Sequence, residues 1–502
     1  MRTESVIVIG GGLGGISSAL HLCARGLKVT MVEKGTMLGG RARVFREGDF
    51  YFDAGPTVIT APSLLRELFS ILGERLEDHV ELLPVAPWYR MAFADGTYLD
   101  YGGDDDAMCA QIARFNPDDV DGYRALCRHA DALYEVGYAR LSHVPFHSPW
   151  QMLRALPDMA RLRCDRTVFQ LVSRHIKDAR LRQAFSVHPL LVGGNPLTTT
   201  SIYSLIQSLE RREGIWFPRG GTGALVAALG ALATRHGVDI RTDTEVKNIT
   251  LSTTGACRAT GVALADRPPM SADHIVCNVD PLWAYRHLLP TSASSRWNAK
   301  KLAATDASMG LFVLYFGTGQ AYPDVAHHTI LFGGNFEAEL KSVFMRGKIE
   351  DDFSIYLHRP SATDPAMAPM GRDAFYALVA VPNLGAAIDW SREGENLKAR
   401  VIAKLASTLL PGLRAQLQDN FIITPEYFRD VLNSWVGAGF SVAPHFTQSA
   451  WFRFHNRAEG IENLYFAGAG THPGAGVPGV IQSGRIAADL IAPPNGTQYA
   501  AA

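Results

Sequence analysis

Three glycines near the N-terminus, Gly10, Gly12 and Gly15, have the spacing of a loop that binds phosphates. The first allows a tight turn, the second lets the backbone approach a pyrophosphate, and the third lets the next helix pack closely on the preceding strand. Glu33 follows at the distance where a carboxylate accepts the hydroxyl protons of an adenosine ribose. This pattern predicts dinucleotide binding, with Leu13, Gly14 and Lys34 as further candidate contacts.

These residues require a strand, a tight turn and a helix in that order. The run 6–9 is continuously β-branched, apolar residues recur at helical spacing from Ile16, and 28–33 alternates as a second strand. Such a β-α-β unit is typical of a doubly wound parallel sheet. The same strand and helix patterns recur later in the chain. We expect a helix over 224–235, strands over 239–241, 245–251, 274–278 and 464–467, and a helix over 482–491.

Differences in composition and hydrophobic pattern along the chain predict two domains. We expect residues 1–85, 216–290 and 456–492 to form one discontinuous, Rossmann-like α/β domain. Residues 86–215 and 291–455 are richer in aromatic side chains, proline and long apolar strands such as 309–317 and 375–381. They would form an inserted α+β substrate domain with a helical, membrane-associating region. The tail 493–502 is small and polar and is expected to be disordered.

A second glycine pair, followed by an arginine, indicates which dinucleotide binds. Gly39 and Gly40 let the backbone lie against a cofactor, and Arg41 supplies a guanidinium for its phosphates. Together with Glu33 they resemble the extended motif of the FAD-dependent amine oxidase and phytoene desaturase superfamily. The resemblance implies FAD as the cofactor. It also implies flavin contacts and an adenine contact at four further residues: Gly55, Pro56, Thr57 and Val246.

The segment 463–480 gives the most specific signal in the chain. Its sequence resembles the C-terminal signature of bacterial-type phytoene dehydrogenases, as do 53–60, 188–196, 216–222 and 447–453. The segment also predicts a strand, a glycine-rich loop and a helix that begins near residues 478–480. Such a helix N-terminus would stabilise negative charge on a flavin that accepts hydride. The implied FAD contacts here are Gly468, Ala469, Gly479 and Val480.

The resemblance implies FAD-dependent desaturation of phytoene by successive hydride removal, which gives neurosporene and/or lycopene. Phytoene and partly desaturated carotenes offer no charge to grip, so binding must bury apolar surface, worth roughly 25 cal/mol per Å². Oxygen and a quinone both stay open as the terminal electron acceptor. His188 and Arg154 are the candidates for the proton step. A core histidine and a solvated basic face are the simpler interpretations of these two residues.

Three rival functions remain on sequence grounds. Another flavin oxidase, acting on an amine or a porphyrinogen, would share the N-terminal motifs but lack the loop 472–479. A desaturase or isomerase of a later carotenoid would share both. A lipid-escort protein that kept the fold but lost the cofactor would be colourless.

Charge and cysteine usage limit the partners. The chain of 502 residues has 48 Lys and Arg against 49 Asp and Glu, a formal charge of −1, so no global field attracts nucleic acid. Six isolated cysteines without a C-x-x-C pair are expected to be reduced thiols. The doublet of His327 and His328 would point to opposite faces of a strand, so no metal site is predicted.

A basic stretch from Arg154 to Arg182 contains eight basic and three acidic residues, next to apolar side chains such as Trp150 and Leu153. This combination suits a surface that lies on anionic lipid, although a solvated helix interrupted by Pro157 would look similar. The N-terminus lacks the apolar stretch of a signal peptide. We expect a peripheral protein on the cytoplasmic side of the cell membrane, and a homo-oligomer there stays open.

Overall fold

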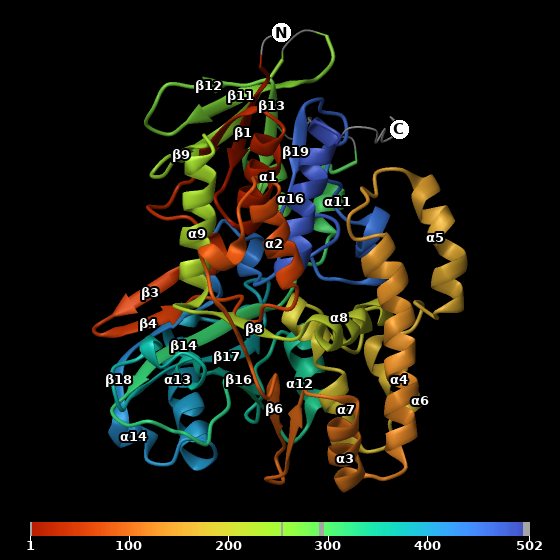
Figure 1. Cartoon of the computed structure of the whole chain (residues 1–502), viewed down its shortest axis with the longest axis vertical. Coiled ribbons are helices and arrows are strands. Elements are labelled where there is room, and N and C mark those ends of the chain that lie inside the picture. Colours follow the sequence, from red (N-terminus) through yellow and green to blue (C-terminus); the bar gives the residue numbers. More distant parts are fainter. Residues whose placement is uncertain (1–2, 253–254, 291–295, 495–502) are drawn as a thin grey trace.

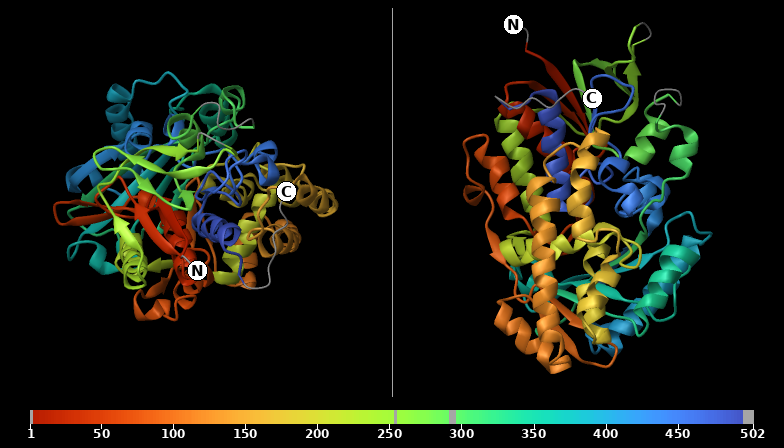
Figure 2. Two further views of the ribbon diagram at one scale, coloured as in Figure 1. Left: turned by 90° about the horizontal axis from the view of Figure 1, so that it is seen from above. Right: turned by 90° about the vertical axis from the view of Figure 1, so that its right-hand side faces the viewer.

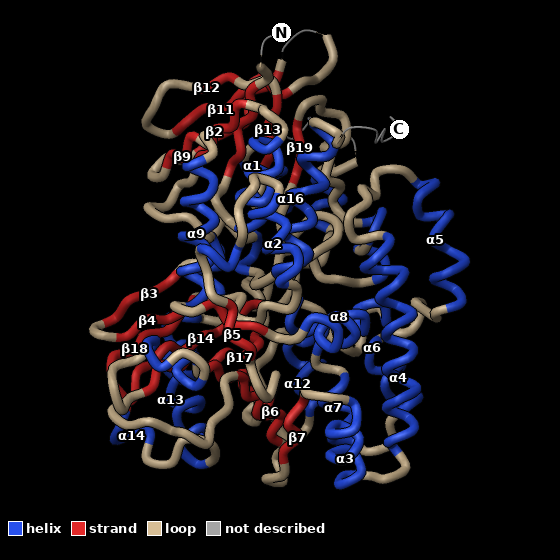
Figure 3. The backbone as a smooth tube through the Cα atoms, in the orientation of Figure 1, coloured by secondary structure: helices blue, strands red, loops and turns tan. Residues whose placement is uncertain are grey.

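The computed structural model describes residues 3–252, 255–290 and 296–494. The molecule is elongated, and its strands gather in two groups, one at the upper end and one at the lower left of Figure 3. Helices between residues 105 and 213 form a layer along one side, which faces the viewer in the right-hand view of Figure 2. Of the tail predicted to be disordered, residues 495–502 lie outside the described residues.

The upper group is built on a five-stranded parallel sheet in the order β19-β13-β1-β2-β9. In β1, Val6 and Val8 point to one face and Ile7 and Ile9 to the other, and all four are buried. Burial on both faces explains the continuous β-branched run. The strands are β1 (Ser5–Ile9), β2 (Lys28–Val32), β9 (Asp239–Arg241), β13 (His274–Cys277) and β19 (Leu464–Phe466).

Long helices cover one face of this sheet, and a small antiparallel sheet and two short helices lie over the other (Figure 1). A Cβ added to Gly484 would lie 2.4 Å from the carbonyl oxygen of Gly14, so the first and last long helices can cross this closely only because Gly484 has no side chain. The elements are α1 (Leu13–Ala24), α2 (Pro62–Ser70), α9 (Gly221–Arg235), α10 (Pro281–His287), α11 (Ala299–Ala303), α16 (Val477–Ile491), β10 (Val246–Leu251), β11 (Ala259–Leu264) and β12 (Met270–Ser271).

The lower group is a seven-stranded mixed sheet in the order β18-β14-β17-β16-β15-β6-β7. Its centre is the antiparallel pair β14 and β17, whose nine residues pair without a break from Gly310 opposite Val381 to Thr318 opposite Asp373. The strands are β6 (Tyr89–Ala92), β7 (Tyr98–Tyr101), β14 (Gly310–Thr318), β15 (His328–Leu331), β16 (Ile355–His358), β17 (Asp373–Val381) and β18 (Leu417–Ile423).

Two short strand pairs and the remaining helices complete the fold. The pairs are β3 (Val44–Glu47) with β4 (Phe50–Asp53) and β5 (Leu82–Pro84) with β8 (Trp216–Pro218). The helices are α3 (Asp105–Phe115), α4 (Asp119–Tyr134), α5 (Pro149–Arg161), α6 (Val168–His175), α7 (Ala179–Phe185), α8 (Leu205–Glu213), α12 (Phe336–Lys341), α13 (Trp390–Ser407), α14 (Leu413–Gln416) and α15 (Pro425–Asp430).

The mixed α/β content and the parallel sheet agree with the predicted fold class. Every strand of the five-stranded sheet comes from 1–85, 216–290 or 456–492, and every strand of the seven-stranded sheet comes from 86–215 or 291–455.

The expected interruption at Pro157 is wrong, because α5 continues through this residue to Arg161. A capping box of Ser148 and Gln151 and a proline at the first helical position favour helix formation here.

Candidate functional site

A cavity of about 590 Å³ lies at the carboxyl edge of the five-stranded sheet. Ligands of doubly wound sheets bind at this edge, because the strands end there and the loops supply the contacts. Gly15 alone among the predicted cofactor contacts does not line the cavity. Those that line it are Gly10, Gly12, Leu13, Gly14, Glu33, Lys34, Gly40, Arg41, Gly55, Pro56, Thr57, Val246, Gly468, Ala469, Gly479 and Val480.

The three motif glycines have distinct structural reasons. Gly10 has φ +94°, a left-handed conformation that favours glycine. Gly12 precedes α1 and borders the cavity, so its missing side chain leaves room for a ligand. A Cβ on Gly15 would lie 2.1 Å from the carbonyl oxygen of Gly10, which forces α1 to pack without a side chain there. Gly15 therefore packs against the backbone of the glycine loop and does not face the cavity.

Glu33 is buried at the end of β2, and backbone amides hold its carboxylate in place. One oxygen accepts a hydrogen bond from the Gly11 N–H and the other from the Gly35 N–H, both at 2.8 Å. A carboxylate has lone pairs beyond these two bonds, so it can also accept from a ribose. Lys34 donates to the Asn433 side chain at 2.7 Å, and burial lowers the pKa of its ammonium group.

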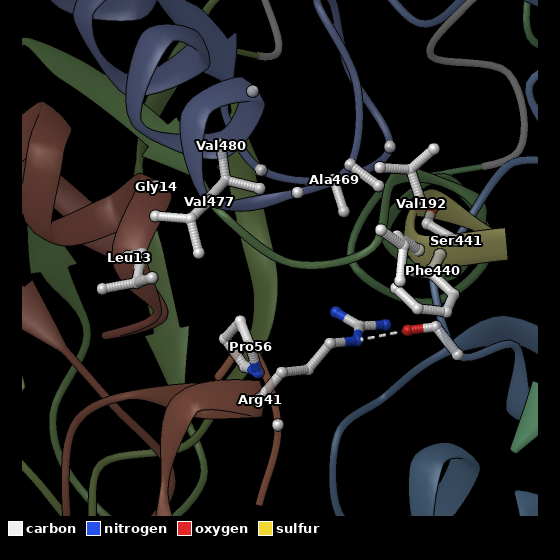
Figure 4. Close-up of a pocket in the computed structure, with 18 of the residues that line it drawn as sticks. Leu13, Gly14, Arg41, Pro56, Val192, Phe440, Ser441, Ala469, Val477 and Val480 are labelled. Carbon is white, nitrogen blue, oxygen red and sulfur yellow. Dashed lines mark hydrogen bonds between the residues drawn. The ribbon is translucent and has the colours of Figure 1, made fainter. Parts of the chain in front are cut away.

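A partly buried arginine stands opposite the N-terminal end of α16 across the cavity (Figure 4). Arg41 donates to the Gly439 carbonyl oxygen at 2.9 Å and to the Ser434 hydroxyl at 3.0 Å. That hydroxyl lies 3.2 Å from Asp280, whose pKa is raised by burial and held down in part by the Arg41 charge. The guanidinium is thus fixed in orientation and balanced by a carboxylate.

The glycine-rich loop between β19 and α16 is held in place by Arg453, whose side chain is fully buried. Its guanidinium donates to the carbonyl oxygens of Ala469 at 2.7 Å and Thr471 at 3.1 Å. The loop leads into α16, which begins at Val477 after Gly476 at φ +95°. The helix thus begins slightly earlier than the predicted 478–480, and its first turn lines the cavity.

The cavity continues away from the sheet between apolar walls. One wall is β14 and β17 of the seven-stranded sheet, and another is the inner face of α5 with Met152, Ala155 and Met159. Two π-helical segments, Glu135–Arg140 and Ser342–Arg346, also contribute lining residues. π-Helical turns are frequent at functional sites, but periodicity in a sequence does not reveal them.

The two candidates for the proton step do not line this cavity. His188 is 1% exposed, and its Nε2 lies 3.0 Å from one carboxylate oxygen of Glu210. The other oxygen of this carboxylate accepts a hydrogen bond from the Tyr89 hydroxyl at 3.0 Å. Arg154 is exposed on the outer face of α5. Both stay predictions, and the geometry supports instead the simpler interpretations of a core histidine and a solvated arginine.

Several site residues escaped sequence reasoning. Asn278 follows β13 directly, and its side chain lies among the glycines of both loops, with Nδ2 donating to the Gly10 carbonyl oxygen at 3.3 Å. The Thr57 hydroxyl lies 2.7 Å from that of Tyr376 and 3.4 Å from that of Tyr356, and all three residues line the cavity. Of these residues, only Asn278 could have been found from the sequence, because it stands at the end of a predicted parallel strand.

The expected orientation of the His327–His328 doublet is wrong, whereas the expected absence of a metal site stays a prediction. His327 precedes β15, so strand alternation does not separate the two rings, whose centroids lie 4.4 Å apart. Strand pairing adds His358, and these three residues form a cluster that could hold a metal ion.

Burial raises the pKa of Asp53, at the end of β4, to about 7. One of its oxygens accepts from the Gly223 N–H, and the other has no hydrogen-bond partner among the described residues. Because the unfolded carboxyl titrates near its ordinary pKa of about 3.9, the unfolded chain loses this proton first as pH rises. The free energy of unfolding should therefore fall between about pH 4 and pH 7, by up to about 4 kcal/mol.

Asp53→Asn should remove this part of the pH dependence. The midpoint of thermal unfolding is measured for both proteins between pH 5 and pH 8, and the difference between wild type and variant is followed with pH. The wild type should lose stability relative to the variant as pH rises. Parallel pH profiles would contradict the raised pKa.

A family described as flavin-containing amine oxidoreductase matches residues 13–492. The lycopene-forming phytoene desaturase of Pseudescherichia vulneris is 46% identical over 489 residues, which cover 97% of this chain and 99% of that protein. The neurosporene-forming phytoene desaturase of Rhodobacter capsulatus is 42% identical over 490 residues, covering 97% and 93%.

Solved structures agree in fold. A redesigned putrescine oxidase gives a TM-score of 0.63 at 15% identity, covering 98% of this chain and 100% of that chain. An oxidoreductase from Methanosarcina mazei gives 0.65 at 17% identity, covering 96% and 98%. The family match and the near-full-length identity to desaturases define the family of the chain, whereas the solved structures show only its fold. The chain belongs to the flavin-containing amine oxidoreductase family and, within it, to the bacterial phytoene desaturases.

Proposed function

We propose that this protein is an FAD-dependent phytoene desaturase, which introduces several conjugated double bonds and yields neurosporene and/or lycopene. The observation that carries this proposal is the single cavity that joins the glycine loops to long apolar walls. A C40 hydrocarbon can be held only by burial of its surface, and such walls supply that burial.

The residues of the site fit FAD. Bare backbone at Gly12 and Gly40 leaves space beside the N-terminus of α1, whose amides favour a pyrophosphate. Glu33 is held by two amides at the expected place of a ribose, and the partly buried Arg41 is available to phosphate. When bound, FAD supplies the hydride acceptor that a dehydrogenation requires.

The protein's own contribution is positioning and the exclusion of water. The rigid loop held by Arg453 fixes the start of α16, whose helix N-terminus favours negative charge in the adjoining cavity. The apolar walls exclude water and hold a long hydrocarbon chain by contact alone. Each desaturation also releases a proton, and we propose oxygen or a membrane quinone as the terminal electron acceptor.

The test is incubation of the purified protein with phytoene in liposomes, followed by extraction of the pigments. Coloured carotene should form, and its conjugation length counts the desaturation steps. Amines and a later carotene serve as competing substrates. Turnover of these with none of phytoene would overturn the proposal in favour of one of its rivals.

We also propose that the protein meets phytoene at a lipid surface, as a peripheral protein on the cytoplasmic side of the membrane. Helix α5 supports this, because Met152 and Ala155 line the cavity while Trp150, Leu153 and Leu156 are 70%, 50% and 41% exposed on the outer side. Within the described residues, no helix is long and apolar enough to cross a membrane.

Acidic residues outside the basic stretch offset part of its charge, because Lys177 pairs with Asp118 and Arg180 pairs with Asp95. Asp158 pairs with Arg140 and Arg161, and Asp165 pairs with Arg163. Apolar contact should therefore dominate over attraction to anionic lipid.

Replacing Trp150, Leu153 and Leu156 together by glutamine should lower binding to phytoene-free liposomes at least tenfold. Each exposed side chain contributes roughly 1.5–3 kcal/mol when fully buried in lipid, and about 1.4 kcal/mol is a tenfold change. Co-sedimentation with liposomes measures the effect, with flavin content as the check on folding. The matched control replaces Met345 and Met370, which are 61% and 101% exposed elsewhere on the surface. Equal binding of the triple variant and the control would contradict α5 as the docking helix.

A further inference from the structure

Three histidines converge inside the seven-stranded sheet, away from the cavity lining. His328 opens β15 and pairs with His358 at the end of β16, and His327 directly precedes β15. Their side chains are buried, with exposures of 2%, 0% and 1% for His327, His328 and His358. One potential ligand nitrogen from each lies within 4.8 Å of the others.

The spacing of two of these nitrogens matches that of ligands on one metal ion. The Nε2 atoms of His327 and His358 are 3.1 Å apart. Zinc bonds to imidazole nitrogen at about 2.0–2.1 Å, which places two ligands of a tetrahedral ion about 3.3 Å apart. The Nε2 of His328 is buried and has no hydrogen-bond partner within the described part of the chain. An unpaired buried nitrogen is costly, and a metal ion would satisfy it.

The outer ring nitrogens of two of the histidines have hydroxyl partners. His327 Nδ1 lies 2.6 Å from the Thr363 hydroxyl, and His328 Nδ1 lies 2.7 Å from the Tyr356 hydroxyl. When Nδ1 donates to such an oxygen, the proton is fixed there and Nε2 keeps its lone pair for a metal. Two of the three rings therefore have an outer partner that orients them.

The charged group beside the cluster is paired, because the Nε of Arg359 lies 2.9 Å from an oxygen of Asp373. Metal binding at this site needs all three imidazoles in their neutral form, with a lone pair on the ligating nitrogen.

We propose that His327, His328 and His358 bind one divalent cation of the class that prefers imidazole, with Zn²⁺ as the best match. The fourth position is left for water. The ion joins β15 to β16 and orients Tyr356, whose hydroxyl also faces Thr57 in the cavity wall. The site is structural, because none of the three histidines lines the cavity.

The experiment uses the flavin-loaded protein, expressed in zinc-supplemented medium and purified without chelator. Elemental analysis should find close to one zinc per chain. His358→Gln should retain at most one-tenth of that zinc while keeping its flavin. His287→Gln is the matched control, because His287 is exposed and outside the cluster, and it should retain the full amount. Wild-type protein without zinc, or His358→Gln with as much zinc as the wild type, would overturn the proposal.

A second measurement covers the case in which His358→Gln fails to fold. Wild-type protein grown with cobalt is compared with wild-type protein grown with zinc, so that the flavin absorbance cancels in the difference spectrum. Ligand-field bands of four-coordinate Co²⁺ with nitrogen ligands support the site. No cobalt bands, or bands of a six-coordinate aqueous type, overturn it.

Discussion

Gly12→Val should reduce FAD retention at least tenfold. Gly12 has φ −73° and ψ 171°, an extended conformation that valine adopts readily, so the chain should still fold. A Cβ there would already lie 3.0 Å from Asn278 Nδ2, and the two methyl groups beyond it would occupy the cavity beside α1. The backbone could then no longer approach a pyrophosphate. Flavin absorbance per chain measures the loss.

The matched control is Gly385→Val. Gly385 is exposed and outside this cavity, and its added Cβ would also have an asparagine side-chain atom 3.0 Å away, the Oδ1 of Asn383. The control should keep its flavin. Full flavin in Gly12→Val would show that the nucleotide site has been placed wrongly.

Ala155→Trp should lower phytoene desaturation by about fivefold or more while flavin content stays unchanged. Ala155 lies on the inner face of α5, is 7% exposed and lines the apolar part of the cavity. An indole there fills space that a long substrate needs. Overpacking of this kind costs about 1–3 kcal/mol, which is roughly 5-fold to 150-fold in rate when it opposes substrate binding. The rate of coloured carotene formation measures the effect.

Ala160→Trp is the control on the same helix. Ala160 is exposed, so the same substitution adds bulk outside the cavity and should leave the rate unchanged. If Ala155→Trp desaturates phytoene as fast as Ala160→Trp, the substrate does not occupy the space beside α5.

The nucleotide half of the site could be predicted because its signals are local. The buried run Val6–Ile9, the glycine loop and Glu33 lie within one β-α-β unit, and their types reflect backbone geometry that the structure shows directly. The strand over 274–278 and the helix over 224–235 were found within a few residues of their observed bounds, β13 (His274–Cys277) and α9 (Gly221–Arg235).

The substrate half could not be predicted in the same way, because it depends on contacts between distant segments. The sheet behind the cavity wall depends on register as well: His358, which does not line the cavity, meets His328 only through the pairing of β15 and β16, and register is not visible in the periodicity of either strand. The π-helical turns that line the cavity look like ordinary helix in sequence. Pro157 indicated a break in α5, and helix capping at Ser148 outweighed it.

The most direct test of the account is the visible spectrum of the purified protein in the absence of oxygen, before and after addition of phytoene-loaded liposomes. We predict flavin bands that bleach while coloured carotene appears, because one cavity brings both molecules together. Flavin that stays oxidised with no colour formed, after membrane binding has been confirmed, would contradict the assignment of phytoene as substrate. A colourless protein without flavin would contradict the cofactor site itself.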